Sequence, residues 1–556
     1  MSNSKNRIKN KKRKKKEKVA NSLDLFDRLD QFFDKNGQIF FWIGMFFTLL
    51  FSFLLFNFRV SEAGDDSAYI LRAFDFVKEL KFPTFQGPLY PIILSFFILI
   101  FGLNVTLLKT LSLIFILVHL YFFYRAFKGR VSSFLLIFVI IIISFNGHLL
   151  YYSSQTYSEA FYLMLQAIFF YYFFRFFVSE ENSPDIKNNW GKYMILGTLL
   201  LSLGLTRSIG YGGFLSVAVF FILTLRWRAL IYSTGGFIIN YGVFGLIKRY
   251  LFNINTSQFD TQINRLMQKN PFDVSEGKED FFGFIVRFWD NSNLYLSKHL
   301  FKFIGIRPEA TDIKVFLTIL VYILFIVAIY FAFKKNRYLL FTGIYLAVLI
   351  GITFIIVQAR WDQSRLVIIY LPLILLFLFS GIYYLSKIKS LKIIQGIFPV
   401  VLVILFFSNL SVTIDKVKEN EEYLTSHLYG DKFYGMTPDW VNYIRMSQWA
   451  AKNIPEDQVI ACRKPSISFI YAKRKFYGIY RIETQDPDEL FQELKDNNVR
   501  YVIMANLRKY PKQKTEYTIN TVKRYLYYIQ QKYPQRIKFV KEIGADEKAY
   551  LFEIVY

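Results

Sequence analysis

The sequence predicts a polytopic α-helical membrane protein with about eleven transmembrane helices and a small C-terminal extracytoplasmic α/β domain. Apolar runs of roughly 18 or more residues recur along most of the chain, and each is long enough to cross a bilayer as a helix. The composition agrees, because 54% of the residues are hydrophobic and 20% are aromatic, more than is usual in soluble globular proteins. From residue 412 onward no apolar run is long enough to span, so the chain ends in a different kind of domain.

Residues 1–38 are interpreted as a basic cytoplasmic tail with a polar lead-in to the first span. The formal net charge of the chain is +26, and much of it lies within residues 5–18. Such a run suits nucleic acid or anionic lipid, but the positive-inside rule favours a topology signal, so we expect no nucleic-acid partner. We also expect no cleaved signal peptide, because polar residues 22–38 separate the basic run from the first apolar span.

Residues 39–411 are expected to form the transmembrane domain, with long external loops at 59–104 and 248–312. The predicted spans are 39–58, 105–124, 132–145, 159–177, 193–206, 211–225, 230–247, 315–333, 338–357, 366–385 and 393–410. Segment 88–101 is also apolar, but it is short and carries two prolines near its start. If it crossed, the basic residues at 125–130 would lie outside, against the positive-inside rule. We therefore assign segment 88–101 to the first external loop. With this assignment the N-terminus lies inside and the C-terminus outside.

Residues 412–556 are expected to form the external α/β domain, which is within the usual size range of a domain. Helices are predicted at 440–453, 489–497 and 522–533, the second after an Asp-Pro-Asp start signal. A strand is predicted at 499–505. Residues 539–543 and 550–555 are predicted to pair as a terminal hairpin around Gly544.

The first external loop carries an acidic pair, Asp65 and Asp66, just beyond the first span. Adjacent carboxylates repel, so one of them is expected to have a raised pKa, which suits a general base or a ligand of a hard cation. The alternative is a solvated loop that merely carries charge. A helix is predicted at 68–80, with an apolar stripe beginning at Tyr69 that suits the membrane surface.

Two further charged residues are predicted at the outer membrane face. Glu159 lies at the mouth of the fourth span, where a carboxylate is either functional or a charge in the first turn of a helix. Arg207 lies between two short spans, where an outward arginine suits a phosphate partner. The alternative for Arg207 is a pairing with a membrane carboxylate.

A third cluster, QARWDQSRL, forms a tight external turn with Arg360, Trp361, Asp362 and Arg365. Arginine forks match phosphate oxygens, so Arg360 and Arg365 are candidates for binding a lipid phosphate headgroup. The alternative is interfacial anchoring with an ion pair between Asp362 and Arg365.

Other classes of site are disfavoured. The sequence contains no Gly-rich phosphate loop and no kinase or hydrolase signature, which argues against ATP-driven transport. The single cysteine, Cys462, excludes an intrachain disulfide framework and a cysteine-based metal cluster. The four histidines are scattered along the chain, so a histidine metal site is not expected.

In their order and sidedness, these features resemble the GT-C superfamily of integral-membrane glycosyltransferases, more closely its protein O-mannosyltransferase and aminoarabinose-transferase-like branch. The matching motifs are GDDSAYILRA in the first loop, the QGPLYP turn, Ile100-Phe101-Gly102, Leu205-Thr206-Arg207 and the span start from Ser364-Arg365-Leu366 to Pro372. The resemblance covers nearly the whole chain.

The resemblance implies a glycosyltransferase of the bacterial plasma membrane that takes a sugar from a polyprenyl-phosphate donor in the outer leaflet. Asp65 would be the catalytic base of an inverting displacement and Asp66 its helper. Arg207, Arg360 and Arg365 would stabilise the leaving lipid phosphate, and Tyr69 and Glu159 would contact substrate. The acceptor, a hydroxyl of a protein, a lipid or a glycan, is left open. We expect no cofactor and no bound metal, although some GT-C relatives use a divalent cation.

Two departures from the family pattern bear on these roles. The acidic residue of the second loop is Glu159 in a Tyr-Ser-Glu context, and Gln86-Gly87 precede Pro88 where some relatives carry a basic residue or a histidine. The second departure weakens a phosphate-binding role for that turn.

Two alternative functions remain. One is a transporter or flippase of lipid-linked saccharide, and the other is a polymerase or ligase of surface polysaccharide. Transporters usually bind at the bilayer midplane, whereas the candidate residues here gather at one membrane face, which favours the enzyme.

Overall fold

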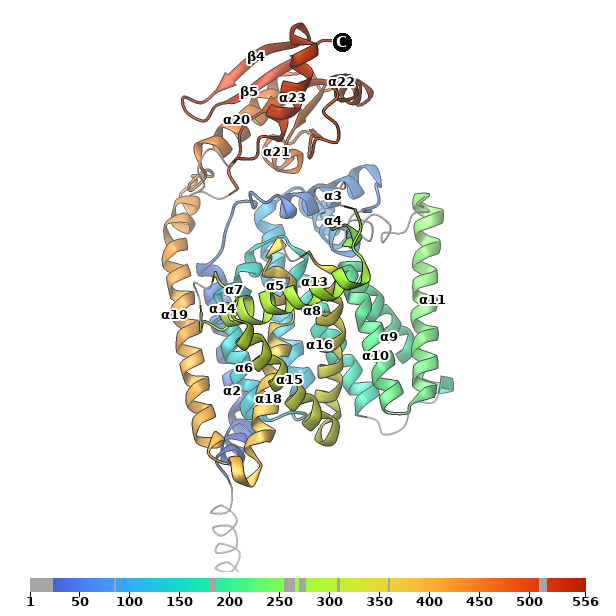
Figure 1. Ribbon diagram of the computed structural model, residues 1–556, viewed down its shortest axis with the longest axis vertical. Coiled ribbons are helices and arrows are strands. Elements are labelled where there is room, and N and C mark those ends of the chain that lie inside the picture. The colour runs from blue at the N-terminus through green and yellow to red at the C-terminus, as the bar shows by residue number, and fades with distance from the viewer. Residues whose placement is uncertain are drawn as a thin grey trace, which may run out of the picture.

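The computed structural model describes residues 24–84, 87–179, 186–254, 266–269, 277–307, 311–358, 361–509 and 518–556. A bundle of long helices carries a small α/β domain at one end (Figure 1). Within these ranges, seven helices are long and apolar enough to cross a membrane: Leu25–Leu54 (α2), Val105–Phe127 (α5), Ser158–Val178 (α8 with η2), Trp227–Phe252 (α11), Val315–Lys335 (α15), Arg337–Ile356 (α16) and Ile394–Leu428 (α19). The chain is therefore a multi-pass membrane protein, as predicted.

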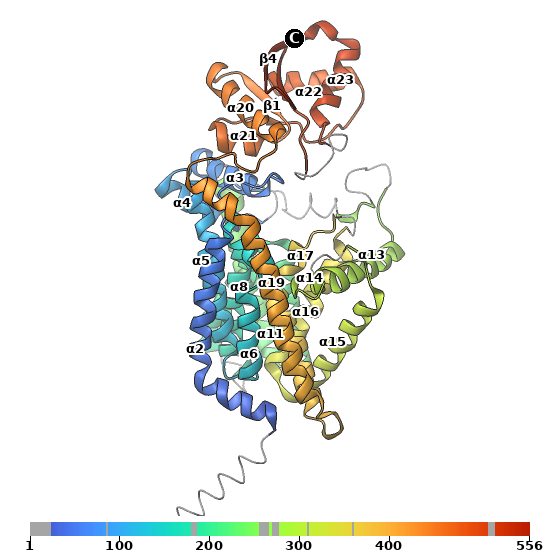
Figure 2. The ribbon, with the colours of Figure 1, turned by 90° about the vertical axis from the view of Figure 1, so that its left-hand side faces the viewer.

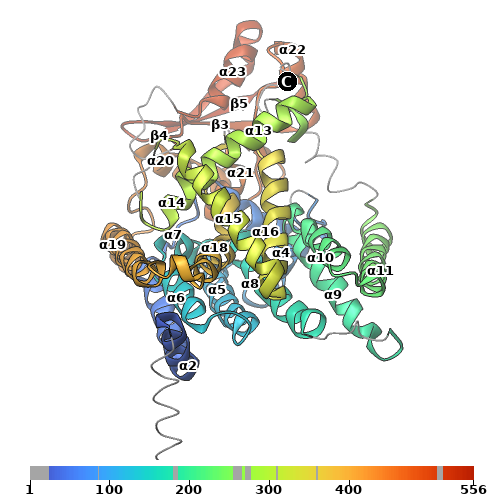
Figure 3. The same ribbon diagram turned by 60° about the horizontal axis from the view of Figure 1, so that its bottom comes forward.

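The expected number of eleven spans is not confirmed by the helices that pass this test. An eighth crossing results if Ser133–Ser144 (α6) and Gly147–Ser154 (α7 with η1), which are bent by 54°, count as one broken span. The shorter apolar helices are Leu89–Phe101 (α4), Ser208–Leu223 (η3 with α10) and Leu371–Ser386 (α18). A further helix, Ile186–Thr206 (α9), packs beside α11. Figure 3 shows α9, α10 and α11 on one side of the bundle and α2, α5 and α6 on another.

The basic turns lie together at the end where α2 begins. Lys387 Nζ lies 2.8 Å from Asp24 Oδ1, and the Tyr383 hydroxyl donates to Asp30 Oδ2 at 2.7 Å. Asn336 Nδ2, from the turn between α15 and α16, donates to the carbonyl of Arg130 at 2.7 Å. The C-terminal domain lies at the opposite end of the bundle from these turns (Figure 2).

The first loop folds into two helices at the end that faces the C-terminal domain. Helix α3 spans Asp65–Glu79 and so begins three residues before the predicted start, which places the acidic pair in its first turn. Gly64 precedes it with φ of +89°, a left-handed conformation that glycine adopts at little cost. The neighbouring α4 has only 13 residues. It buries Leu94 and leaves Leu99 exposed.

The second long loop also contains helix. Phe281–Asn293 (α13) continues through the π-helical turn Leu294–His299 (η5) into Leu300–Phe303 (α14). The exposed apolar side chains of α13 are Phe281, Phe282, Ile285, Val286 and Trp289. Residues 281–303 of this loop are thus helical throughout.

The last span is longer than predicted. Helix α19 runs without interruption from Ile394 to Leu428, so the expected boundary at 411/412 falls inside it. Asn420, beyond that boundary, donates from Nδ2 to the carbonyl of Leu54 at 2.9 Å. The polar second half of α19 therefore packs against the end of α2 and leads to the C-terminal domain (Figure 2).

The C-terminal domain is built on a five-stranded sheet of order β2-β1-β3-β5-β4. Its strands are Val459–Cys462 (β1), Tyr477–Gly478 (β2), Val499–Met504 (β3), Ile537–Ile543 (β4) and Ala549–Ile554 (β5), and its helices are Pro438–Asn453 (α20), Pro465–Ala472 (α21), Pro487–Asp496 (α22) and Thr521–Lys532 (α23). The β4–β5 hairpin and its antiparallel pairing confirm the prediction. Strands β1 and β2 and helix α21 are too short to be recognised by periodicity.

This domain rests on α3 through α21. Ser466 Oγ lies 2.9 Å from Ser67 Oγ, and the rings of Phe469 and Phe74 lie 4.9 Å apart. At the far end of α3, Lys475 Nζ lies 2.5 Å from Asp75 Oδ1. The predicted acidic loop is therefore held between the bundle and the C-terminal domain.

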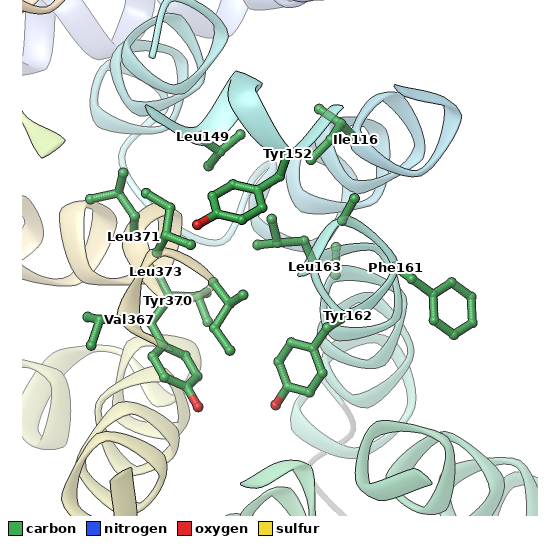
Figure 4. Packing of buried hydrophobic residues seen from close by; sticks show 14 of the residues in the cluster. Ile116, Leu149, Tyr152, Phe161, Tyr162, Leu163, Val367, Tyr370, Leu371 and Leu373 are labelled. Carbon is green, nitrogen blue, oxygen red and sulfur yellow. The ribbon is translucent and has the colours of Figure 1, made fainter. Parts of the chain in front are cut away.

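Beneath the loop, aromatic and aliphatic side chains from distant helices form one core. Figure 4 shows Tyr162 of α8 near Tyr370, with Leu163 and Leu373 packed beside them. This core aligns the start of α8 with the short helix Arg365–Ile368 (α17) that precedes α18.

Candidate active site

The site is organised around Arg365, the first residue of α17. Its Nη1 atom lies 2.5 Å from Oδ2 of Asp65, and its Nε lies 4.0 Å from Oε1 of Glu159. Asp65 is the first residue of α3, and Glu159 is in the first turn of α8. Three helix N-termini thus bring two carboxylates to one guanidinium.

A second arginine completes the group. Arg207 directly follows α9, and its Nη1 atom lies 2.8 Å from Glu159 Oε1. The Glu159 side chain is only 2% exposed, so this pair is shielded from solvent. Arg207 is thus paired with a carboxylate, Glu159, which was the alternative to a phosphate partner.

Ser158 and two tyrosines surround these charges. The Tyr69 hydroxyl donates to Ser158 Oγ at 3.3 Å, and Arg207 Nη1 donates to the same oxygen at 3.4 Å. The Arg365 guanidinium lies over the ring of Tyr157, 5.7 Å from its centroid, an arrangement that stabilises a cation. Tyr69, Glu159, Arg207, Arg365 and Asp65 are therefore neighbours, although the sequence places them in four separate segments.

The two adjacent carboxylates have different environments. The Asp65 side chain is 36% exposed, whereas Asp66 is fully buried. Asp66 accepts hydrogen bonds of 2.7 Å from the backbone N–H groups of Ser61 and Ser67. Burial raises the pKa of Asp66, and repulsion by Asp65 contributes less than burial does. The predicted direction of the shift is thus right, but its main cause is desolvation.

Lys109 was not predicted from the sequence to belong to the site. It lies in α5 and is fully buried, and its Nζ donates to the carbonyl of Ser154 at 2.9 Å. Its positive charge acts on Asp66. The available signal was a lysine within an apolar run, which in a membrane span is a functional candidate by default.

In the turn that contains Arg365, Asp362 does not form the ion pair with Arg365 that was given above as an alternative. Asp362 pairs with Lys298 Nζ at 2.6 Å and His299 Nε2 at 2.7 Å, rather than with Arg365. Asp362 has a φ of 43°, a conformation that is uncommon for a residue other than glycine. The ion pairs of Asp362 with η5 hold this turn and leave Arg365 to Asp65. Arg360 lies outside the described residues.

The described side chains of the site do not form a cluster of metal ligands. Within the described ranges, no group of three or more His, Cys, Asp and Glu side chains is placed to hold a metal ion. The exposed carboxylate, Asp65, faces a guanidinium. A cation at Asp65 would have to displace Arg365.

The charges of the site balance. Asp65 and Glu159 contribute two negative charges, and Arg207 and Arg365 contribute two positive charges. Each guanidinium carries five N–H donors, more than these carboxylate contacts use. The site can therefore accept a proton at Asp65 and direct further donors from Arg365 to an anion.

Comparison with known proteins gives a likeness of structure alone. No family model matches the chain, and no curated protein sequence matches it. Among solved structures, ArnT from Cupriavidus metallidurans bound to undecaprenyl phosphate superposes with a TM-score of 0.52 at 12% identity, covering 93% of this chain and 98% of that one. The archaeal oligosaccharyltransferase AglB from Archaeoglobus fulgidus, in complex with an inhibitory peptide and a dolichol-phosphate, superposes with a TM-score of 0.51 at 10% identity and covers 93% and 74%.

A second structure of the Archaeoglobus fulgidus oligosaccharyltransferase, in complex with Zn and sulfate, has a TM-score of 0.52 at 11% identity and covers 83% of this chain and 68% of that one. These proteins are membrane glycosyltransferases of the GT-C superfamily. At such low identity the likeness concerns the fold, and fold by itself does not fix function. The likeness shows that this chain has the fold of these proteins.

Proposed function

We propose that this chain is a glycosyltransferase that moves a sugar from a polyprenyl-phosphate donor to an acceptor hydroxyl on the extracytoplasmic side. The observation that carries the proposal is the contact of Arg365 with both Asp65 and Glu159. In the described part of the chain, this contact leaves a partly exposed carboxylate beside a cation with further N–H donors, which supports Asp65 as the base and Arg365 as the phosphate ligand that this reaction needs. The printed ligands of the structural neighbours, undecaprenyl phosphate and dolichol-phosphate, support the donor class.

In the proposed step, the acceptor O–H gives its proton to the Asp65 carboxylate. The acceptor oxygen forms a bond to the anomeric carbon while the bond from that carbon to the phosphate oxygen breaks, so the electron pair leaves with the lipid phosphate. Attack from the face opposite the phosphate inverts the configuration. Arg365 turns its donors from Asp65 to the developing phosphate charge as Asp65 becomes neutral.

Glu159 and Arg207 have a supporting part in this proposal. Glu159 is buried and already paired, so it holds both guanidiniums in place. The positive charge of Arg207, which is paired with Glu159, helps to stabilise the negative charge of the leaving phosphate. Tyr69 lines the site through its hydrogen bond to Ser158, and Arg360 remains a candidate for the lipid phosphate.

Asp66 is assigned a different role from that of a second base. Its two backbone hydrogen bonds hold the turn that leads into α3. It would thus help Asp65 by positioning it. We also infer that the protein resides in the bacterial plasma membrane with its basic N-terminal tail in the cytoplasm and the C-terminal domain outside.

The test is the Asp65→Asn variant in proteoliposomes, supplied with a panel of undecaprenyl-phosphate monosaccharides and an extract of the cell envelope as acceptor. We expect release of undecaprenyl phosphate to fall by about 100-fold or more, since loss of a general base costs that much. Asp75→Asn is a matched control, because Asp75 lies on the same helix and pairs with Lys475 instead. Full transfer by Asp65→Asn would refute the assignment. Movement of the labelled lipid across the bilayer without transfer by the wild type would favour a flippase.

A further inference from the structure

Lys464 joins the C-terminal domain to the turn that ends at Asp65. Its Nζ donates to the carbonyl of Ala63 at 2.8 Å and to the carbonyl of Glu62 at 3.2 Å. These are the second and third residues before Asp65. A single side chain of the C-terminal domain therefore binds the backbone that presents the proposed base.

The turn needs such a partner. Helix α3 begins at Asp65, and Gly64 at its N-cap position has no side chain that could cap the helix, so the turn before the helix is held by other groups. Within the turn, Gly64 N–H donates to the carbonyl of Ser61 at 2.9 Å, and Asp66 holds Ser61 from the other side. Lys464 binds carbonyls that this network leaves unused within the described residues.

Lys464 is itself anchored. It precedes α21, and its backbone N–H donates to the Tyr443 hydroxyl at 3.1 Å. Two residues further along the chain, Ser466 lies 2.9 Å from Ser67 of α3. Lys464 thus connects the start of α21 in the C-terminal domain to the turn at residues 62–64 on the membrane bundle.

We infer that Lys464 is a positioning residue for the proposed reaction and that the C-terminal domain is therefore part of the catalytic unit. Lys464 holds the 62–64 turn so that Asp65 meets Arg365 and the acceptor hydroxyl at bonding distance. This inference rests on the proposed function, because it assigns Lys464 a role through Asp65. A loosened turn should lower kcat more than it weakens donor binding, because misplacement of a reacting group slows the chemical step.

The charge of Lys464 makes this contact dependent on pH. Burial lowers the pKa of Lys464 to about 8, and the nearby Arg463 and Lys509 act in the same direction, while Asp65 and Glu62 oppose it. Tyr443 also faces Lys464, through the hydrogen bond to its backbone. As pH rises through about 8, the ammonium becomes an amine and its hydrogen bonds to the two carbonyls weaken. Turnover should then fall on the alkaline side.

The experiment compares Lys464→Met, Lys464→Arg and Lys475→Met in the full-length protein in proteoliposomes, with the undecaprenyl-phosphate monosaccharide that the wild type uses. Lys475 is the matched control, because it also joins the C-terminal domain to α3 but contacts Asp75 and Glu79 at the far end of the helix. Lys464→Met should lower kcat at pH 7 by about 10-fold, with the donor KM within twofold. Lys475→Met should keep the wild-type kcat.

Lys464→Arg is the second readout, because arginine stays charged throughout. It should retain most of the kcat at pH 7 and lose the decline above pH 8. Hydrogen exchange of residues 61–66 should rise in Lys464→Met and stay unchanged in Lys475→Met. A kcat of Lys464→Met within twofold of wild type, or an alkaline decline that persists in Lys464→Arg, would overturn the inference. Full activity of Asp65→Asn would instead refute the proposed function itself.

Discussion

Arg365 contacts Asp65 at 2.5 Å, which joins the turn before α18 to the first turn of α3. Each residue alone has an ordinary explanation as a charged group at a membrane surface. Their contact brings a carboxylate next to a guanidinium that has more N–H donors than this carboxylate uses. The proposed chemistry depends on this contact.

The first prediction concerns Arg365. Arg365→Met should raise the KM for an undecaprenyl-phosphate donor and lower kcat/KM by about 10- to 100-fold, since hydrogen bonds to charged groups contribute about 1.5–3 kcal/mol. Arg365→Lys should recover only part of this loss, because lysine lacks the planar fork. Steady-state kinetics in proteoliposomes measure both. Equal kcat/KM in all three proteins would exclude Arg365 from the phosphate site.

The second prediction concerns the buried pair of Glu159 and Arg207. Glu159→Gln should destabilise the protein by about 3–5 kcal/mol, because it leaves a shielded guanidinium without its counter-charge. The melting temperature in detergent should fall accordingly. The double variant Glu159→Gln/Arg207→Met should recover much of the loss. If the two single substitutions simply add, the pair is not coupled as its 2.8 Å distance indicates.

The third prediction follows from the raised pKa of Asp66. The folded protein binds a proton at Asp66 more tightly than the unfolded chain does, because burial disfavours the carboxylate. The contribution of Asp66 to stability is therefore fully present below the ordinary carboxyl pKa and is lost as pH rises through the raised one.

Asp66→Asn removes this titration. The melting temperature of Asp66→Asn minus that of wild type should therefore increase as pH rises across that interval. Thermal melts from pH 4 to pH 8 in one buffer series measure this difference. A difference that stays constant or decreases with pH would contradict the shift.

The fourth prediction concerns divalent cations. A cation that binds the Asp65 carboxylate must displace Arg365, so we expect EDTA to leave donor turnover unchanged within twofold. Added Mg²⁺, Mn²⁺ or Zn²⁺ at millimolar concentration should likewise not raise it. Loss of turnover in EDTA with recovery on adding one of these metals would show that a cation takes part at the site.

Much of the arrangement could be predicted because it depends on local properties of the chain. The long apolar runs require helices that cross a membrane, since backbone groups in lipid must bond within their own segment. The terminal hairpin follows from two alternating runs around Gly544. The broken pair α6 and α7 is harder to count, because hydropathy does not report the 54° bend between the two helices.

The candidate residues were predicted individually from their sidedness, but their partners were not. Arg207 was expected to face a phosphate and is paired with Glu159. The ion pair of Asp362 with Arg365, given above as an alternative, is not formed, because Asp362 contacts Lys298 and His299. Two residues on separate helices meet only when both helices are packed. The pattern of charges within one segment therefore cannot choose between the available partners.

The sequence by itself determined the membrane class and named the candidates in the first loop, because hydropathy and charge act through local physical rules. Only the tertiary structure decided that Asp65 and Asp66 differ, since burial depends on what packs over α3. It also decided that Lys464 of the C-terminal domain binds the turn before Asp65. Such contacts join segments far apart in the chain, and their geometry arises from the packing of whole helices against one another.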